Sequence, residues 1–477
     1  MSYSETCSAP VGEGSFKKRF DAFLANPNYI ILVMFLCGVA NIASQELIVY
    51  GIYTLLAVYI LVFAQDILGL MPLVMAYYLA PSTINNPGRN HLSIFSFAQG
   101  GWLILIYGVL LAIALLIRII RDRGQLFTKK NALISGILVL CAGYLLSGIG
   151  SAAYPESLGK NLLFAFVQCC SVALPYWLFS GCINWKKVRV DYFAWLGFCV
   201  GLLLLTELGW IYLKQGVVVD GIIHRQQIFT GWGIHNNIGG LLAMMIPFAF
   251  YLATKYHKGW IGTVVGSGLL ICVFLTCSRS SILVGSGIYA VCIYLMLHYA
   301  RNRRANTIAL ITICGSILLI LIFFHNELLL LFSDILSRGL DPSNRDAIYI
   351  EGWKLFAQAP VLGNSFYSPG YLPWDWSQVA SFSDMFPPRW HNTIIQLLTS
   401  CGIVGLIAYL FHRIQTARFF LKNPSKETNF IGLSILVLLL CSLFDCHFFN
   451  IGPVLFYSMA LAFAEHCHEL KNTLDAQ

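Results

Sequence analysis

The sequence predicts an all-α, polytopic transmembrane helix bundle. Its 477 residues are 58% hydrophobic and 11% charged, with a mean hydropathy of +0.72, and apolar runs of helix-spanning length recur from residue 29 to residue 467. A soluble domain carries about a quarter charged residues. Because lipid offers no hydrogen bonds, each spanning segment must pair its own backbone N–H and C=O groups, as a helix or a closed barrel does. The sequence lacks the alternation of polar and apolar residues that barrel strands show. The spans are therefore predicted to be helices.

The order of polar and apolar segments predicts five regions. Residues 1–28 are polar and end in a basic run, which is typical of a cytoplasmic tail and not of a cleaved signal. We expect transmembrane helices over 29–324, a long extracytoplasmic loop over 325–392, C-terminal transmembrane helices over 393–467 and a cytoplasmic tail over 468–477. Since a span needs about 20 residues, we expect about 12–14 spans. Fourteen candidates lie at 29–47, 48–66, 67–81, 101–119, 131–150, 161–182, 192–213, 234–254, 260–277, 281–299, 306–324, 393–412, 430–449 and 451–467.

Charge fixes the orientation of these spans. Residues 29–81 could hold two long spans or three short ones, but only three place the basic cluster 118–130 in the cytoplasm, as the positive-inside rule requires. By this count 21 of the 30 Lys and Arg residues are cytoplasmic, so the net charge of +8 reflects topology and gives no reason to expect nucleic acid as a partner. The positive-inside rule does not explain the nine Lys and Arg residues that this topology places on the extracytoplasmic side. They are Arg89, Lys160, Lys214, Arg225, Arg279, Arg338, Arg345, Lys354 and Arg389.

The 325–392 loop is the only long connection in this topology. It contains seven acidic and four basic residues and several tryptophans. Connections of this length are usually functional or disordered, and the aromatic content argues against disorder. Because aromatic side chains suit the membrane interface and stack on sugar rings, we expect an ordered cap that lies on the bilayer.

Arg279 lies in a polar hinge, residues 277–281, between two apolar runs. The hinge predicts a tight hairpin with Arg279 at its outer end. A snorkelling side chain would explain the arginine, and so would an anion clamp, because guanidinium pairs with phosphate in a bidentate manner.

Arg345 follows Ser343, a plausible helix N-cap, and precedes a short amphipathic segment bounded by Pro360. In the first turn of a helix, the dipole disfavours a cation. An arginine at this position is explained if both its guanidinium and the helix N-terminus face an anion. The alternative interpretation is a solvated surface arginine.

His391 and Asn392 come directly before the apolar run 393–412. Asn392 is predicted to be the N-cap of a membrane helix, which leaves His391 at the edge of the bilayer. The positive helix end and any nearby arginine disfavour imidazolium, and a general base at pH 7 must be neutral. A purely structural interfacial histidine is the other interpretation.

Arg225 opens a fourth segment, residues 225–240, which leads into the span at 234–254. Its glycines permit close helix packing. Its spacing places Arg225 outside, near the other candidate residues.

In this order, the four segments resemble the O-antigen ligase and O-antigen polymerase superfamily of bacterial envelopes. Arg279 through Leu283 is similar to the R-x3-L motif of that superfamily, and His391-Asn392, followed by nine residues and by Gly402 and Gly405, is similar to its H-[NS]-x9-G-x-x-G motif. Residues 345–363 also match the loop pattern. The 225–240 segment is similar to the R…G…N-P-N element, from which it departs at His235.

The resemblance implies an inverting, metal-independent glycosyltransferase of GT-C-like fold in the bacterial inner membrane, with its active site on the periplasmic side. The donor would be a glycan on undecaprenyl diphosphate, and the acceptor a glycan or a lipid A core sugar. Arg279, Arg345 and Arg225 would bind the diphosphate and His391 would be the catalytic base, with Asn392, Gly402 and Gly405 in support. No cofactor is implied, and the acidic residues are too sparse for a hard-metal site.

Two alternatives remain at this stage. The compact loop favours a ligase, but a polymerase that joins lipid-linked repeat units fits the same motifs. A transporter of lipid-linked glycan would place ionisable residues near the midplane and show internal repeats. Asp66, Glu207 and Asp445 are the main acidic residues in or beside the spans, and no repeat is evident.

A topology map tests the orientation directly. We expect reporter fusions at Arg279 and His391 to report an extracytoplasmic location, because the positive-inside count places both hinges outside. Fusions at residues 187 and 304, in predicted cytoplasmic connections, serve as controls. A cytoplasmic signal at Arg279 and His391 would contradict a transferase that acts on the outer face.

Overall fold

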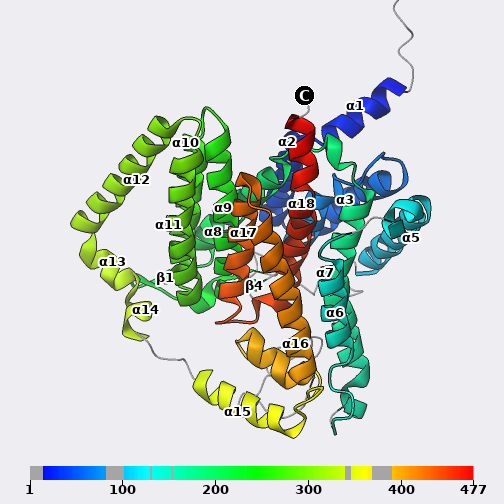
Figure 1. The fold of residues 1–477 in the computed structure, drawn as a ribbon. Coiled ribbons are helices and arrows are strands. Elements are labelled where there is room, and N and C mark those ends of the chain that lie inside the picture. The colour runs from blue at the N-terminus through cyan, green and yellow to red at the C-terminus, as the bar shows by residue number, and fades with distance from the viewer. Residues whose placement is uncertain are drawn as a thin grey trace, which may run out of the picture.

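The computed structural model describes residues 14–81, 101–128, 131–152, 154–230, 233–338, 345–367 and 389–475, and these form a bundle of helices (Figure 1). The first half of the chain contains eight α-helices and one 3-10 helix in its described part. They are α1 (Gly14–Leu24), α2 (Pro27–Ala43), α3 (Glu46–Val62), α4 (Leu70–Leu79), α5 (Gly101–Thr128), α6 (Ile134–Leu145), α7 (Tyr154–Cys182), η3 (Trp185–Lys187) and α8 (Tyr192–Lys214).

The second half begins with two short antiparallel hairpins and continues with helices. The hairpins pair β1 (Val218–Val219) with β2 (Ile222–Ile223), and β3 (Phe229–Thr230) with β4 (Gly233–Ile234), and η4 (Arg225–Gln227) lies between them. The helices are α9 (His235–Lys255), α10 (Trp260–Leu275), α11 (Arg279–Tyr299), α12 (Arg303–Phe323), α13 (His325–Leu331), α14 (Ser333–Arg338), α15 (Arg345–Gln358), α16 (Thr393–Lys422), α17 (Lys426–Cys441), η7 (His447–Phe449) and α18 (Ile451–Asp475).

These helices confirm the predicted all-α membrane fold. Each of the fourteen expected spans overlaps one of the helices α2–α12 and α16–α18. Within the described ranges, seven helices are long and apolar enough to cross a membrane, or eight if α1 and α2, bent by 72°, count as one span. Five shorter apolar helices of 10–17 residues accompany them. The chain is therefore a multi-pass membrane protein.

Helix α9 is the centre of the bundle. It packs against α8, α10, α11 and α17, and 94% of its most apolar 18-residue window is buried. Small residues allow the close contact with α10: a Cβ on Gly262 would lie 2.4 Å from the Ala249 carbonyl oxygen. In α5 and α12 only 11% of the corresponding window is buried, so these two helices present their apolar side chains to lipid.

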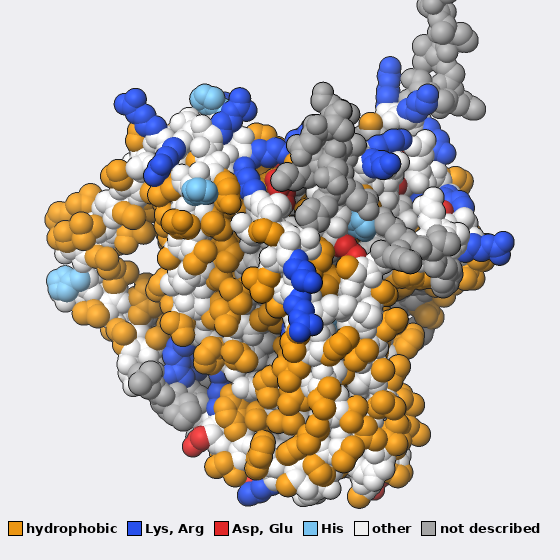
Figure 2. Space-filling view, viewed as in Figure 1, with side chains coloured by type: hydrophobic (Ala, Val, Ile, Leu, Met, Phe, Trp, Pro, Cys, Tyr) orange, Lys and Arg blue, Asp and Glu red, His pale blue; other side chains and the backbone are white. Residues whose placement is uncertain are grey.

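The two ends of the bundle differ in charge. Lysine and arginine side chains gather at the end that carries α1 and the C-terminus, whereas α15 lies at the opposite end (Figures 1 and 2). Hydrophobic side chains cover much of the surface between the ends in this view. The asymmetry is what the positive-inside rule leads one to expect if α15 is extracytoplasmic.

The structure differs in detail from two predicted segments. The span expected at 430–449 ends as a helix at Cys441, and a polar connection with η7 follows it, in which Asp445 accepts a hydrogen bond from Asn236 of α9 and Asn450 donates one to Asn237 of α9. The loop expected at 325–392 contains α13 and α14 in addition to the expected helix α15. The predicted cap Ser343 lies outside the described residues.

Helix α16 is kinked at Gly402, which has φ +63° and ψ −162°. The kink frees backbone groups that the 359–365 segment then satisfies. The Asn364 N–H donates to the Thr399 carbonyl at 2.8 Å, and the Ile403 N–H donates to the Pro360 carbonyl at 2.9 Å. A helix break at membrane depth is tolerated only when protein groups re-pair the backbone in this way.

Substitution Gly402→Ala is expected to destabilise the protein. A Cβ at this position would lie 2.3 Å from the Val361 carbonyl oxygen, in addition to a strained positive φ that costs about 1–3 kcal/mol. The melting temperature in detergent should fall by several degrees. Gly287→Ala in α11, where a Cβ meets nothing within 4 Å, is the matched control and should not lower it. Equal melting temperatures for the two variants would contradict the role of the kink.

Candidate functional site

The candidate site is built around the first residues of α16. The Asn392 carboxamide oxygen accepts hydrogen bonds from the Ile394 and Ile395 N–H groups at 2.8 and 3.2 Å, which confirms the predicted N-cap. Its Nδ2 donates to the Leu443 carbonyl at 2.8 Å. Asn392 therefore fixes the start of α16 against the connection that follows α17.

His391 precedes this cap in a left-handed backbone conformation, with φ +49°. Such a conformation is costly for a non-glycine residue and is often found at functional sites. The Tyr349 hydroxyl of α15 donates to the His391 carbonyl at 3.2 Å, and the Trp390 N–H donates to Gln396 Oε1 at 3.2 Å. Hydrogen bonds on both sides thus hold the strained residue in place.

Asp445 is the partner of the His391 side chain. His391 Nδ1 lies 3.4 Å from Asp445 Oδ1, and the aspartate is only 4% exposed. The same carboxylate accepts hydrogen bonds from Asn236 Nδ2 of α9 at 3.2 Å and from the Cys446 N–H at 2.7 Å. One buried carboxylate therefore connects α9, α16 and the connection between α17 and α18.

The surroundings of Asp445 keep it ionised. Burial would raise the pKa of this carboxyl group, but the imidazoles of His391 and His447 and the N–H of Cys446 outweigh burial and hold the pKa well below its ordinary value. A buried charge with these partners remains negative at neutral pH. It can therefore orient the His391 ring through Nδ1 and leave Nε2 to act on another group.

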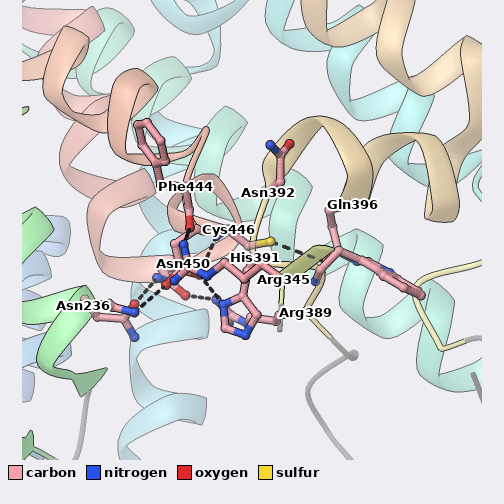
Figure 3. Close-up of polar contacts among 12 residues, drawn as sticks. Asn236, Arg345, Arg389, His391, Asn392, Gln396, Phe444, Cys446 and Asn450 are labelled. Carbon is pink, nitrogen blue, oxygen red and sulfur yellow. Dashed lines mark hydrogen bonds and ion pairs between the residues drawn. The ribbon is translucent and has the colours of Figure 1, made fainter. Parts of the chain in front are cut away.

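Two arginines border this pair. Arg345, at the start of α15, donates to the Phe444 carbonyl at 2.6 Å, and Arg389 donates to the side-chain oxygen of Asn450 (Figure 3). Burial lowers the pKa of His447, and both arginines lower it further, against the influence of Asp445. The region around His391 is thus electropositive outside its single buried carboxylate.

Arg279 is the first residue of α11, directly after the turn that ends α10, and this confirms the predicted hairpin. The turn packs against the start of α9: a Cβ on Gly239 would lie 2.7 Å from Thr276 Oγ1 and 2.9 Å from the Ser281 side chain. Because Asn236 belongs to the same first turn of α9, the Arg279 turn and the Asp445 cluster both pack against one helix start.

The remaining candidates lie farther from His391. Arg225 is in η4, and its Nε is 3.7 Å from Asp334 Oδ2 of α14. Gly402 receives the 359–365 segment, and Gly405 lies against Gly143 of α6. The structure therefore groups Arg345, His391 and Asn392 closely, and assigns the two glycines to the packing that supports α16.

The sequence analysis did not assign four of the polar groups around His391 to the site: Asn236, Asn450, Asp445 and the Tyr349 hydroxyl. For Asp445 a signal existed, because an acidic residue in an apolar segment is a functional-site candidate by default. Asn236 lies in the 225–240 segment that resembles the R…G…N-P-N element, whereas no local pattern distinguishes Asn450 and Tyr349 from ordinary polar residues. In the described ranges, no group of three His, Cys, Asp or Glu residues is placed to hold a metal ion.

A comparison with protein families matches residues 263–410 to the O-antigen ligase model. This segment belongs to the O-antigen ligase family. The match confirms the resemblance drawn from the sequence. It includes Arg279, Arg345, His391, Asn392, Gly402 and Gly405.

Other residues of the candidate site lie outside the matched segment. Arg225 and Asn236 precede it and Asp445 follows it, so the side-chain partner of His391 comes from a region that the family model does not cover. No curated protein is a significant match to the chain. The match supports an O-antigen ligase- or polymerase-like function for this segment of a membrane protein.

The contact with Asp445 predicts a specific kinetic defect. Asp445→Asn keeps the size of the side chain but removes the charge that orients His391, so the rate of transfer should fall at least about tenfold. Because the substitution acts on the orientation of His391 and leaves the arginines in place, the turnover number should fall while the KM for the donor changes little. Asp346→Asn, on the exposed face of α15, is the matched control. An unchanged turnover number would exclude this positioning role.

Proposed function

We propose that the chain is an inverting, metal-independent glycosyltransferase of the GT-C type. It moves a glycan from undecaprenyl diphosphate to an acceptor hydroxyl at the outer face of the bacterial inner membrane. The observation that carries the proposal is the His391–Asp445 pair at 3.4 Å, bordered by Arg345 and Arg389, within a fold that carries an O-antigen ligase segment.

The chemistry assigned to His391 is general base catalysis. With Nδ1 directed at Asp445, Nε2 accepts the proton of the acceptor hydroxyl. The acceptor oxygen then attacks the anomeric carbon, and the bond from that carbon to the diphosphate oxygen breaks. Attack opposite the leaving group inverts the anomeric configuration. The proton ends on His391, and the electron pair leaves with the diphosphate.

The arginines have the complementary role. Arg279, Arg345 and Arg225 would bind the diphosphate, because guanidinium groups offer paired N–H donors to phosphate oxygens and stay charged. Preorganised positive charge stabilises the departing anion and removes the need to protonate it. A lipid-linked donor carries its diphosphate at the membrane surface, the depth at which α11 and α15 begin in this proposal.

A ligase is the preferred assignment, with a lipid A core sugar or another envelope carrier as the acceptor. The 325–392 segment is a small extracytoplasmic loop in this proposal, and its helix α15 packs on α16 beside His391. A polymerase would use the same chemistry with a lipid-linked repeat unit as the acceptor. The two reactions differ in what accumulates when the protein is lost.

Surface glycan from a deletion strain tests the proposal. Loss of a ligase should leave long polymer on undecaprenyl diphosphate, and loss of a polymerase should leave single repeats on the acceptor. His391→Ala and Arg279→Ala should each fail to restore the normal gel pattern while the protein still inserts, because one lacks the base and the other an anion-binding charge. Membrane fractions probed for the protein verify insertion.

Matched controls separate these roles from general damage. His325→Ala and Lys354→Ala change exposed residues of α13 and α15 and should restore the pattern. A normal gel pattern in the deletion strain would reject both the ligase and the polymerase. Full complementation by His391→Ala or Arg279→Ala would refute the role assigned to that residue.

A further inference from the structure

The segment that carries Arg225 is held against α13 and α14. The β1–β2 hairpin contacts both helices, and a Cβ on Gly221 would lie 2.9 Å from the Leu330 side chain. Gly221 has φ +79°, so this turn can approach α13 in a conformation that other residues rarely adopt. The packing brings η4, and with it Arg225, beside Asp334.

The contact between Arg225 and Asp334 is a loose ion pair. Their charged atoms are 3.7 Å apart, and the Arg225 and Asp334 side chains are 16% and 30% exposed. The Arg225 Nε atom is buried and makes no hydrogen bond in the described structure. A buried donor without an acceptor is costly, so the carboxylate balances the charge of the guanidinium without satisfying its geometry.

We propose that Asp334 is an internal anion that competes with the donor diphosphate for Arg225. The inference rests on the proposed function, in which Arg225 binds diphosphate. A diphosphate carries more charge than a carboxylate and can meet a guanidinium with two parallel hydrogen bonds, so it displaces Asp334. When the lipid diphosphate must leave after transfer, the return of Asp334 to Arg225 favours release, a step that often limits turnover.

Pyrophosphate binding to the full-length protein in detergent tests the competition. Asp334→Asn should bind inorganic pyrophosphate about threefold or more tightly than the unsubstituted protein, by isothermal titration calorimetry, because a competing ion pair of ordinary strength is removed. Glu327→Gln, which removes a charge from an exposed position of α13, controls for long-range electrostatics and should bind as the unsubstituted protein does. Combination with Arg225→Ala should abolish the gain.

Hydrogen exchange on the unsubstituted protein gives a second test that does not depend on how the variants fold. Pyrophosphate should slow exchange in residues 223–228 and accelerate it in 333–338, because Arg225 gains a ligand as Asp334 leaves. Slower exchange in both segments would overturn displacement. So would an affinity of Asp334→Asn no higher than that of Glu327→Gln.

The outcomes separate this inference from the proposed function. If Arg225→Ala and Arg279→Ala bind pyrophosphate as tightly as the unsubstituted protein, the proposed diphosphate site itself is wrong. If both variants lose binding while Asp334→Asn gains none, only the competition by Asp334 is wrong.

Discussion

The buried carboxylate of Asp445 connects the parts of the molecule that build the candidate site. Its two oxygens are shared by His391 before α16, Asn236 at the start of α9, and the backbone of Cys446. An isolated buried charge would be very unfavourable, so these partners must be present together. Because they come from segments far apart in the sequence, the charge couples the placement of His391 to the packing of α9, the best-buried helix of the bundle.

The bilayer imposes the second constraint. Helices that satisfy their own backbone can cross lipid, and polar chemistry is then confined to helix ends and to breaks that protein groups re-pair. The candidate site follows this rule: the caps and turns at Asn392, Arg279 and Arg345 are all helix starts. The Gly402 kink is the exception within a helix, and the 359–365 segment supplies the missing hydrogen bonds there. Helix starts also carry partial positive charge, which suits a site for an anionic leaving group.

Local signals made much of this predictable from the sequence. The cap at Asn392, the start of α11 at Arg279 and the place of Arg345 in the first turn of α15 each depend on a few neighbouring residues, and all three predictions were confirmed. The contact between His391 and Asp445 depends on packing across the bundle, which local sequence does not reveal. Asp445 also lies at the end of an apolar run that was predicted to be part of a longer span. The pairing of Arg225 with Asp334 was equally inaccessible, because the packing of a hairpin on α13 and α14 leaves no periodic pattern.

The most direct test of the central claim is transfer by the purified protein. The full chain in proteoliposomes, given a lipid-linked glycan donor and its acceptor in the presence of a chelator, should form glycosylated acceptor and release undecaprenyl diphosphate in equal amounts. His391→Gln should bind donor but form neither product, because it retains polarity without a basic nitrogen. Equal rates for His391→Gln and the unsubstituted protein, or transfer that requires an added divalent metal, would contradict a metal-independent reaction in which His391 is the base.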